Sequence, residues 1–192
     1  MEKYNNQDND EYLLENNLLG IKSYEELLEA EALSFSLRAA ELERQGYRPT
    51  FFTLENFKKL HKHLFQDIYP FAGEFRNVQL MKGSTRFCQV KYLDEYAKDL
   101  FLKINEEPHW HSLEEAAGRL AFFKSELNML HPFREGNGRT IRIFIHAFAL
   151  SKGIEWNYET ISREKYMKAM MQSVLNTKLL TQLFMETIHY VE

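Results

Sequence analysis

The sequence is poor in the features that mark a secreted or membrane-embedded chain. It contains one cysteine, Cys88, so no disulfide can form within the chain and we expect a reducing compartment. Charged residues interrupt every apolar run well before the ~18 residues that a membrane-spanning helix needs. Residues 1–11 are rich in Asn, Asp and Glu and lack the basic-then-apolar pattern of a secretion signal. These absences together predict a cytoplasmic protein.

The chain also lacks an excess of positive charge and any linker. Its formal net charge is −4 at pH 7, which gives no basic field that would favour nucleic acid or an acidic membrane as a partner. Prolines number four and glycines eight, and we find no internal repeat or low-complexity tract. A chain of 192 residues suffices for a well-buried core, so we expect one domain over residues 1–192, with a flexible polar segment at 1–14.

The chain does contain a series of helical patterns. Ser23 with Glu26, and Ser112 with Glu115, have the spacing of capping boxes, which satisfy free backbone donors at a helix start. Apolar residues at helical spacing predict helices at 24–45, 53–66, 93–105, 113–130, 138–152, 162–174 and 177–191. The segment 138–152 is apolar on most sides, so we expect it at the centre of the core. The fold class is therefore mainly α.

One stretch changes its period from that of a helix to that of a strand. Phe75, Val78 and Leu80 alternate with polar residues, a polar turn follows, and apolar residues resume at Phe87. This pattern is typical of a β-hairpin. A lone hairpin is marginal in water, so it must contact the helices, and its exposed edge is suited to pairing with an extended peptide. Residues 78–90 are thus a candidate docking flap, although a simple connector fits the pattern equally well.

The densest chemistry lies between two of the predicted helices. Gly136 and Gly138 let the backbone pass close to a ligand. The helix that follows them begins with free N–H groups and a partial positive charge. Arg139 and Arg142 lie near its start and carry guanidinium groups that suit phosphate oxygens. This segment predicts a site for a polyphosphate.

Four further side chains of the same segment add functional chemistry. The amide of Asn137 can donate to a phosphate oxygen without adding charge. Glu135 supplies one hard oxygen ligand, which is sufficient for a Mg²⁺ ion that also binds phosphates and water. His131 titrates near neutral pH and can accept a proton from a hydroxyl. Phe133, between polar neighbours, is expected to turn inward and anchor the loop to the core.

Each of these features also has an ordinary structural explanation. A histidine at a helix end, an arginine pair and a glycine turn are each common without any function. Their concentration in the twelve residues 131–142 is what favours function over scaffold. The pairs His61/His63 and His109/His111 are weaker candidates for a metal site, because no acidic or cysteine partner lies beside them at ligand spacing.

The run His131-Pro132-Phe133-Arg134-Glu135-Gly136-Asn137-Gly138-Arg139-Thr140-Ile141-Arg142 resembles the signature of Fic-domain proteins. That signature is His-x-Phe-x-Asp/Glu-Gly-Asn-Gly-Arg-x-x-Arg, and every specified position is filled. Residues 69–76 are similar to the family's approach to its hairpin, which is called the flap. The resemblance covers residues from about 15 to 190, and it implies a compact Fic-type helical bundle with a small β-hairpin flap.

The resemblance also implies an activity. Fic enzymes of this kind transfer AMP from ATP to a Ser, Thr or Tyr hydroxyl of a target protein and release pyrophosphate. His131 would deprotonate the hydroxyl, and Glu135 would hold Mg²⁺ against the α- and β-phosphates. The phosphate-binding residues would be Gly136, Asn137, Gly138, Arg139 and Arg142. The flap that holds the target by main-chain pairing would consist of Leu80, Met81, Lys82, Gly83, Ser84, Thr85, Arg86 and Phe87.

Regulation is the least defined part of the resemblance. Many Fic proteins are inhibited by a helix with the pattern Ser/Thr-x-x-x-Glu-Gly/Asn, whose Glu pairs with the second motif arginine, here Arg142. No terminal helix of this chain carries the pattern, but Glu186 in the last predicted helix is a candidate for a divergent version. The other expectation is a small inhibitory (antitoxin) protein, in which case this chain is the toxin half of a toxin–antitoxin pair.

Two alternatives remain for the function. The same motif serves Fic relatives that move UMP, phosphate or phosphocholine, and the sequence does not identify the part of the pocket that contacts the base. A non-catalytic nucleotide-binding regulator is the second alternative. His131 argues against it, since a protein that only binds a nucleotide needs no base.

Overall fold

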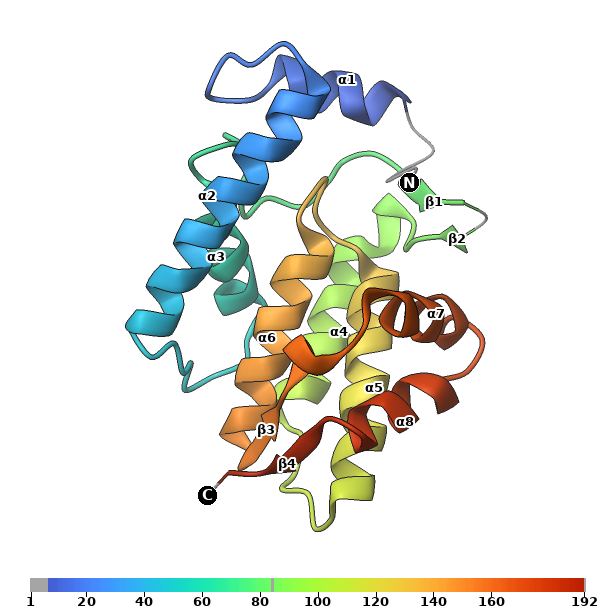
Figure 1. Ribbon diagram of the computed structural model, residues 1–192. Helices are drawn as coiled ribbons and strands as arrows, with labels where there is room; N and C mark the ends of the chain where they lie inside the picture. Colours follow the sequence, from blue (N-terminus) through green and yellow to red (C-terminus); the bar gives the residue numbers. More distant parts are fainter. Residues whose placement is uncertain (1–6, 84, 192) are drawn as a thin grey trace.

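Helices dominate the computed structural model, which describes residues 7–83 and 85–191 (Figure 1). The α-helices in the described residues are α1 (Gln7–Glu15), α2 (Tyr24–Arg44), α3 (Leu54–Phe65), α4 (Leu93–Asn105), α5 (Leu113–Leu130), α6 (Asn137–Ser151), α7 (Arg163–Ser173) and α8 (Lys178–Met185). Two short 3₁₀ helices, η1 (Val90–Tyr92) and η2 (Tyr158–Thr160), join them. The predicted mainly α fold with a small hairpin is confirmed.

The bundle is built around two adjacent helices, α5 and α6 (Figure 1). Helix α6 packs against α3 and α5, and α5 also contacts α4 and α8. Their buried side chains include Phe123, Phe144 and Phe148, which are at most 1% exposed. The hydroxyls of Ser23 and Ser112 accept the backbone N–H of Glu26 and Glu115, as the capping boxes predicted.

The strands form two separate antiparallel pairs. In the first, β1 (Met81–Lys82) pairs with β2 (Thr85–Arg86), with Met81 opposite Arg86. In the second, β3 (Ile154–Trp156) pairs with β4 (Ile188–Tyr190), with Trp156 opposite Ile188.

The predicted helix over 177–191 was therefore too long, since α8 ends at Met185 and β4 follows it. Ile188 is buried where it pairs with β3, and this cross-strand burial overrides helix continuation. The sequence did not signal β3 and β4, because neither strand is stable without the other.

The N-terminus differs from the expected flexible segment at 1–14. Residues 1–6 lie outside the described residues, but Gln7–Glu15 form helix α1. Leu13 in this helix is 1% exposed, and the Tyr12 ring lies 5.7 Å from the Phe71 ring. These contacts hold the helix against the body of the protein. No helix in residues 7–83 and 85–191 is long and apolar enough to cross a membrane.

Candidate active site

His131 ends helix α5 in an unusual backbone conformation. Its φ is 43°, and no other non-glycine residue in the described ranges has a positive φ. Pro132 follows it and cannot continue the helix. The ring Nδ1 lies 3.1 Å from the backbone carbonyl of Asn128, which can only accept a hydrogen bond. The proton therefore sits on Nδ1, and the lone pair that can act as a base is on Nε2.

The His131 ring is neutral at pH 7. Its pKa is lowered to about 3, mainly by burial and also by the nearby positive charges of Arg76 and Lys82, while the hydrogen bond to Asn128 acts in the opposite direction. A neutral imidazole is the form that accepts a proton.

The hairpin lies directly against this histidine. The Phe87 ring stacks on the His131 ring with centroids 3.7 Å apart and planes 7° apart. Phe87 and Leu80 are both buried, and the Phe87 N–H donates to the Leu80 carbonyl over 3.3 Å. The strands are shorter than the predicted alternation over 75–90, and Ser84 of the predicted flap lies outside the described residues. The flap and the predicted base are thus in contact.

Arg76 holds the two ends of the hairpin in place, and the sequence analysis did not identify this residue. Its guanidinium donates to the carbonyls of His131 (2.7 Å), Val78 (2.6 Å) and Cys88 (2.6 Å), with a longer contact to Leu130 (3.5 Å). Its side chain is buried. A buried arginine thus joins both ends of the hairpin to the end of α5. The only signal was a charge within an apolar alternation.

Two glycines frame the start of α6 for different reasons. Gly136 has φ 75°, and a Cβ there would lie 2.4 Å from ring atoms of Phe65, so the fold itself requires glycine. Gly138 has no positive φ, and a Cβ there would meet nothing within 4 Å. It is exposed in the first turn of α6, beside N–H groups that have no acceptor within the helix. The fold does not explain this second glycine, whereas close approach of an anion does.

Asn137 holds the loop together and does not point its side chain outward. Its Oδ1 accepts the Phe133 N–H over 2.9 Å, and its Nδ2 donates to the Phe133 carbonyl over 2.7 Å. The side chain is buried, and in this structure both ends of its amide are engaged with the backbone of Phe133, so its expected donation to a phosphate stays a prediction. Phe133 itself is fully buried, and its ring lies 3.7 Å from that of His61.

His61 belongs to the scaffold of the site. Its Nε2 donates to the Glu135 carbonyl (3.0 Å), and its Nδ1 accepts the Gly73 N–H (2.9 Å). Burial lowers its pKa to about 3, so it stays neutral. The described residues contain no group of three or more His, Cys, Asp or Glu that could hold a metal by themselves. Any metal here needs phosphate and water ligands beside a single carboxylate.

Glu135 and Arg139 meet at the start of α6. Glu135 Oε1 accepts the Gly136 N–H (2.9 Å) and lies 3.3 Å from Arg139 Nη2. The same Nη2 lies 2.6 Å from Oε1 of Glu31, a carboxylate on α2 that is 1% exposed. Glu31 also accepts the hydroxyl of Tyr69 over 2.6 Å. Sequence reasoning missed Glu31, although its position on the buried face of α2 required a partner.

Arg142 faces a different element from Arg139. Its guanidinium lies 5.8 Å from the ring of Tyr158, and it forms no salt bridge with any residue in the described part of the chain. Lys124 on α5 is near enough for Arg142 to lower its pKa, although burial is the larger cause. The expected ion pair with Glu186 is not formed, because Glu186 caps the end of α8 and accepts a hydrogen bond from Gln182.

The comparison with known families agrees with the motif. The family model for Fic/DOC proteins matches residues 51–149, which include the hairpin and residues 131–142. The chain belongs to the Fic/DOC family. Protein adenylyltransferase VbhT of Bartonella schoenbuchensis is 36% identical over 159 residues, which are 82% of this chain and 33% of VbhT. The probable protein adenylyltransferase Fic of Escherichia coli is 34% identical over 155 residues, covering 80% of this chain and 76% of that protein.

Solved Fic structures share the fold of this chain. The crystal structure of BepC from Bartonella tribocorum with bound AMPPNP has a TM-score of 0.83 at 22% identity and covers 92% of each chain. An N-terminal Fic domain from Bartonella quintana with bound ADP has a TM-score of 0.84 at 23% identity, covering 92% of this chain and 91% of that one. At these identities the likeness establishes the fold.

The Fic motif thus divides into three groups of side chains. His131 faces the flap, Glu135 and Arg139 meet at the start of α6, and Arg142 turns toward Tyr158. All of these residues lie at or near the junction of α5 and α6, as expected from their contiguity in the sequence. The sequence did not predict that the Asn137 side chain would form hydrogen bonds with the backbone of Phe133 within the loop.

Proposed function

We propose that this chain is a protein adenylyltransferase, a nucleotidyltransferase that moves AMP from ATP to a hydroxyl of a target protein. The observation that carries the proposal is the neutral His131 imidazole, which lies between the flap and the start of α6. The relatives that are named protein adenylyltransferases support the same activity.

In the proposed reaction, the oxygen of a Ser, Thr or Tyr hydroxyl attacks the α-phosphorus of ATP. A new P–O bond forms, the bond between the α-phosphorus and the bridging oxygen breaks, and pyrophosphate leaves. Nε2 of His131 takes the hydroxyl proton, while the hydrogen bond from Nδ1 to Asn128 keeps that tautomer in place. Stacking on Phe87 fixes the plane of the ring.

The phosphates would bind at the start of α6. Backbone N–H groups of residues 137–139 and the helix dipole favour an anion there, and Gly138 leaves the approach open. Arg139 and Arg142 would take the outer phosphates. Glu135 would hold Mg²⁺, and its single carboxylate suits an ion that draws its other ligands from phosphate and water. When bound, Mg²⁺ would neutralise phosphate charge.

The target segment would pair along β1 and β2 by main-chain hydrogen bonds and present its hydroxyl to His131. We also propose that residues 1–192 form one Fic domain and that it acts in the cytoplasm. Control would come from a small inhibitory protein, with this chain as the toxin half of the pair. Arg142 has no ionic partner in the described residues that would supply such control from within.

The proposal is tested by adding ATP labelled at either the α- or the γ-phosphate to a bacterial extract with the purified protein. We expect label in target proteins only from the α position. If target proteins are labelled only from the γ-phosphate, the protein transfers phosphate and the proposed adenylylation is wrong.

His131→Ala should lower the transfer by about 10²–10⁴ while leaving ATP binding by calorimetry nearly unchanged. His131→Asn is the matched variant, because asparagine tolerates a positive φ and removes only the base. Equal transfer by wild type and both variants would show that His131 is not the base.

A further inference from the structure

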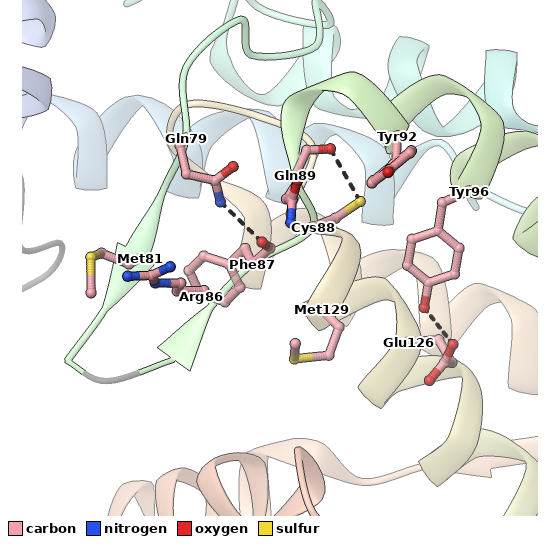
Figure 2. A pocket seen from close by; sticks show the side chains of 10 residues that line it. All are labelled: Gln79, Met81, Arg86, Phe87, Cys88, Gln89, Tyr92, Tyr96, Glu126 and Met129. Carbon is pink, nitrogen blue, oxygen red and sulfur yellow. Dashed lines mark hydrogen bonds between the residues drawn. The ribbon is translucent and has the colours of Figure 1, made fainter.

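A cavity of about 930 Å³ opens beside the hairpin, outside the start of α6 (Figure 2). Helices α4 and α5, η1 and the hairpin contribute its walls, and the phosphate-binding residues of the Fic motif do not line it. Its lining consists of Gln79, Met81, Arg86, Phe87, Cys88, Gln89, Tyr92, Tyr96, Glu126 and Met129. Phe87 is shared, since it lines the cavity and stacks on His131. The cavity therefore begins one aromatic ring away from the proposed base.

The walls of the cavity are mostly apolar, with one carboxylate. Met81, Met129 and the ring of Phe87 form the sides near the hairpin, and Glu126 lies with Tyr96 at the opposite end (Figure 2). The Tyr96 hydroxyl donates to Glu126 Oε2. No other donor to Glu126 occurs in the part of the chain that the structure describes. Glu126 is thus a half-buried anion with one neutral partner and no cation.

The chemistry of this space selects its occupant. A lysine or arginine side chain would place its aliphatic stem along the methionines and phenylalanine, and its charge against Glu126. The tyrosine rings nearby add favourable contact with a cation. An acidic side chain would meet the carboxylate as a like charge, and an apolar one would cover the carboxylate without pairing it. Arg86 lines the end of the cavity at the hairpin and repels a cation there, so the charged group of the target side chain would lie at the end with Glu126.

We propose that the cavity is a specificity subsite that binds an arginine or lysine side chain of the target, close in sequence to the modified hydroxyl. The inference rests on the proposed function, because the target segment must lie along the flap. In an extended segment each residue advances about 3.3 Å, and alternate side chains point to opposite faces. A residue within about three positions of the modified one therefore reaches past Phe87 into the cavity. Glu126 then selects among targets and takes no part in the chemistry.

The test uses α-labelled ATP and pools of peptides, each with one Tyr, Thr or Ser and with Lys, Arg, Glu or Ala at each position within three residues. We expect wild type to prefer Lys or Arg at one fixed position by at least tenfold. Glu126→Gln should abolish that preference, and Glu126→Lys should transfer it to Glu. Glu114→Gln, the same change on the exposed start of α5, should retain the wild-type preference. Tyr96→Phe keeps the charge and should also retain it.

If no peptide is labelled, the same variants are compared on the sites modified in a bacterial extract, mapped by mass spectrometry. Wild-type sites should then carry a basic residue at one fixed position. Glu126→Lys should lose those sites at least tenfold and regain them when the basic residue of the target becomes Glu.

His131-dependent transfer with no basic preference, or a preference that survives Glu126→Gln, overturns the subsite and leaves the proposed function standing. Transfer that is absent, or that persists in His131→Ala, overturns the proposed function and the subsite with it.

Discussion

The two glycines of the motif give a prediction that separates fold from ligand binding. In Gly136→Ala, the new methyl would lie 2.4 Å from the Phe65 ring, on a backbone with φ 75°. The left-handed backbone costs about 1–2 kcal/mol, and forcing the ring aside costs about 1–3 kcal/mol. We therefore expect the free energy of unfolding to fall by about 2–5 kcal/mol.

Gly138→Ala should behave in the opposite way. Its Cβ meets nothing within 4 Å and its φ is not positive, so alanine gains helix propensity of about 0.5–1 kcal/mol. The methyl stands where phosphate oxygens would approach the N–H groups of α6, so ATP affinity should fall at least tenfold.

Urea unfolding and ATP calorimetry on both variants make the comparison. If Gly138→Ala destabilises the protein as much as Gly136→Ala, the space around each Cβ does not determine the stability at these two positions. If Gly138→Ala is stable and binds ATP like the wild type, the start of α6 is not the phosphate site.

Three further predictions concern buried ionisable side chains. Burial lowers the pKa of Lys124 from 10.5 to about 7. The cost of burying this side chain therefore lowers the free energy of unfolding by its full amount below pH 7, and by less and less as the pH rises toward 10.5. Lys124→Met should raise the free energy of unfolding by at most about 5 kcal/mol at pH 6 and by less at pH 9.5. If urea unfolding shows the same increase in stability at both pH values, this prediction is wrong. Because the pKa of His131 is about 3, its base form is lost only near that pH, so kcat/KM for transfer should show no fall near pH 6.5 that depends on this residue. In Arg76→Lys, the single ammonium group cannot reach the carbonyls of both hairpin ends and of α5 at once. KM for the target should therefore rise while the affinity for ATP stays constant. A loss of ATP affinity of equal size would indicate general unfolding instead.

The helices and the motif could be predicted because their signals are local. The caps at Ser23 and Ser112 lie three residues from the N–H groups that they accept, and the twelve motif residues are contiguous. The pairing of β3 with β4 joins segments about thirty residues apart, and no periodicity reveals which short strands meet. The N-terminal helix was hidden by its polar composition, since the burial of Leu13 depends on the rest of the fold.

The direction of polar side chains was harder to predict than their position. Asn137 lies where a phosphate donor was expected, but its amide has a better partner in the backbone of Phe133, four residues away. Arg139 was expected to bind phosphate, and in the structure its guanidinium donates to Glu31, which lies 108 residues earlier on α2. Residue type indicates what a group can bind, and only the tertiary structure decides which partner it meets.

The contacts of Arg76 have a consequence for engineering. The four acceptors described for its guanidinium are all main-chain carbonyls, and every amino acid carries that group. The side chains at Val78 and Cys88 are therefore open to change without loosening the attachment of the hairpin, while position 76 itself is not. A library that randomises the other hairpin positions but keeps Arg76, Leu80 and Phe87 would vary the surface offered to substrates while the hairpin stays attached to α5. Such a library offers a direct route to enzymes that modify new proteins.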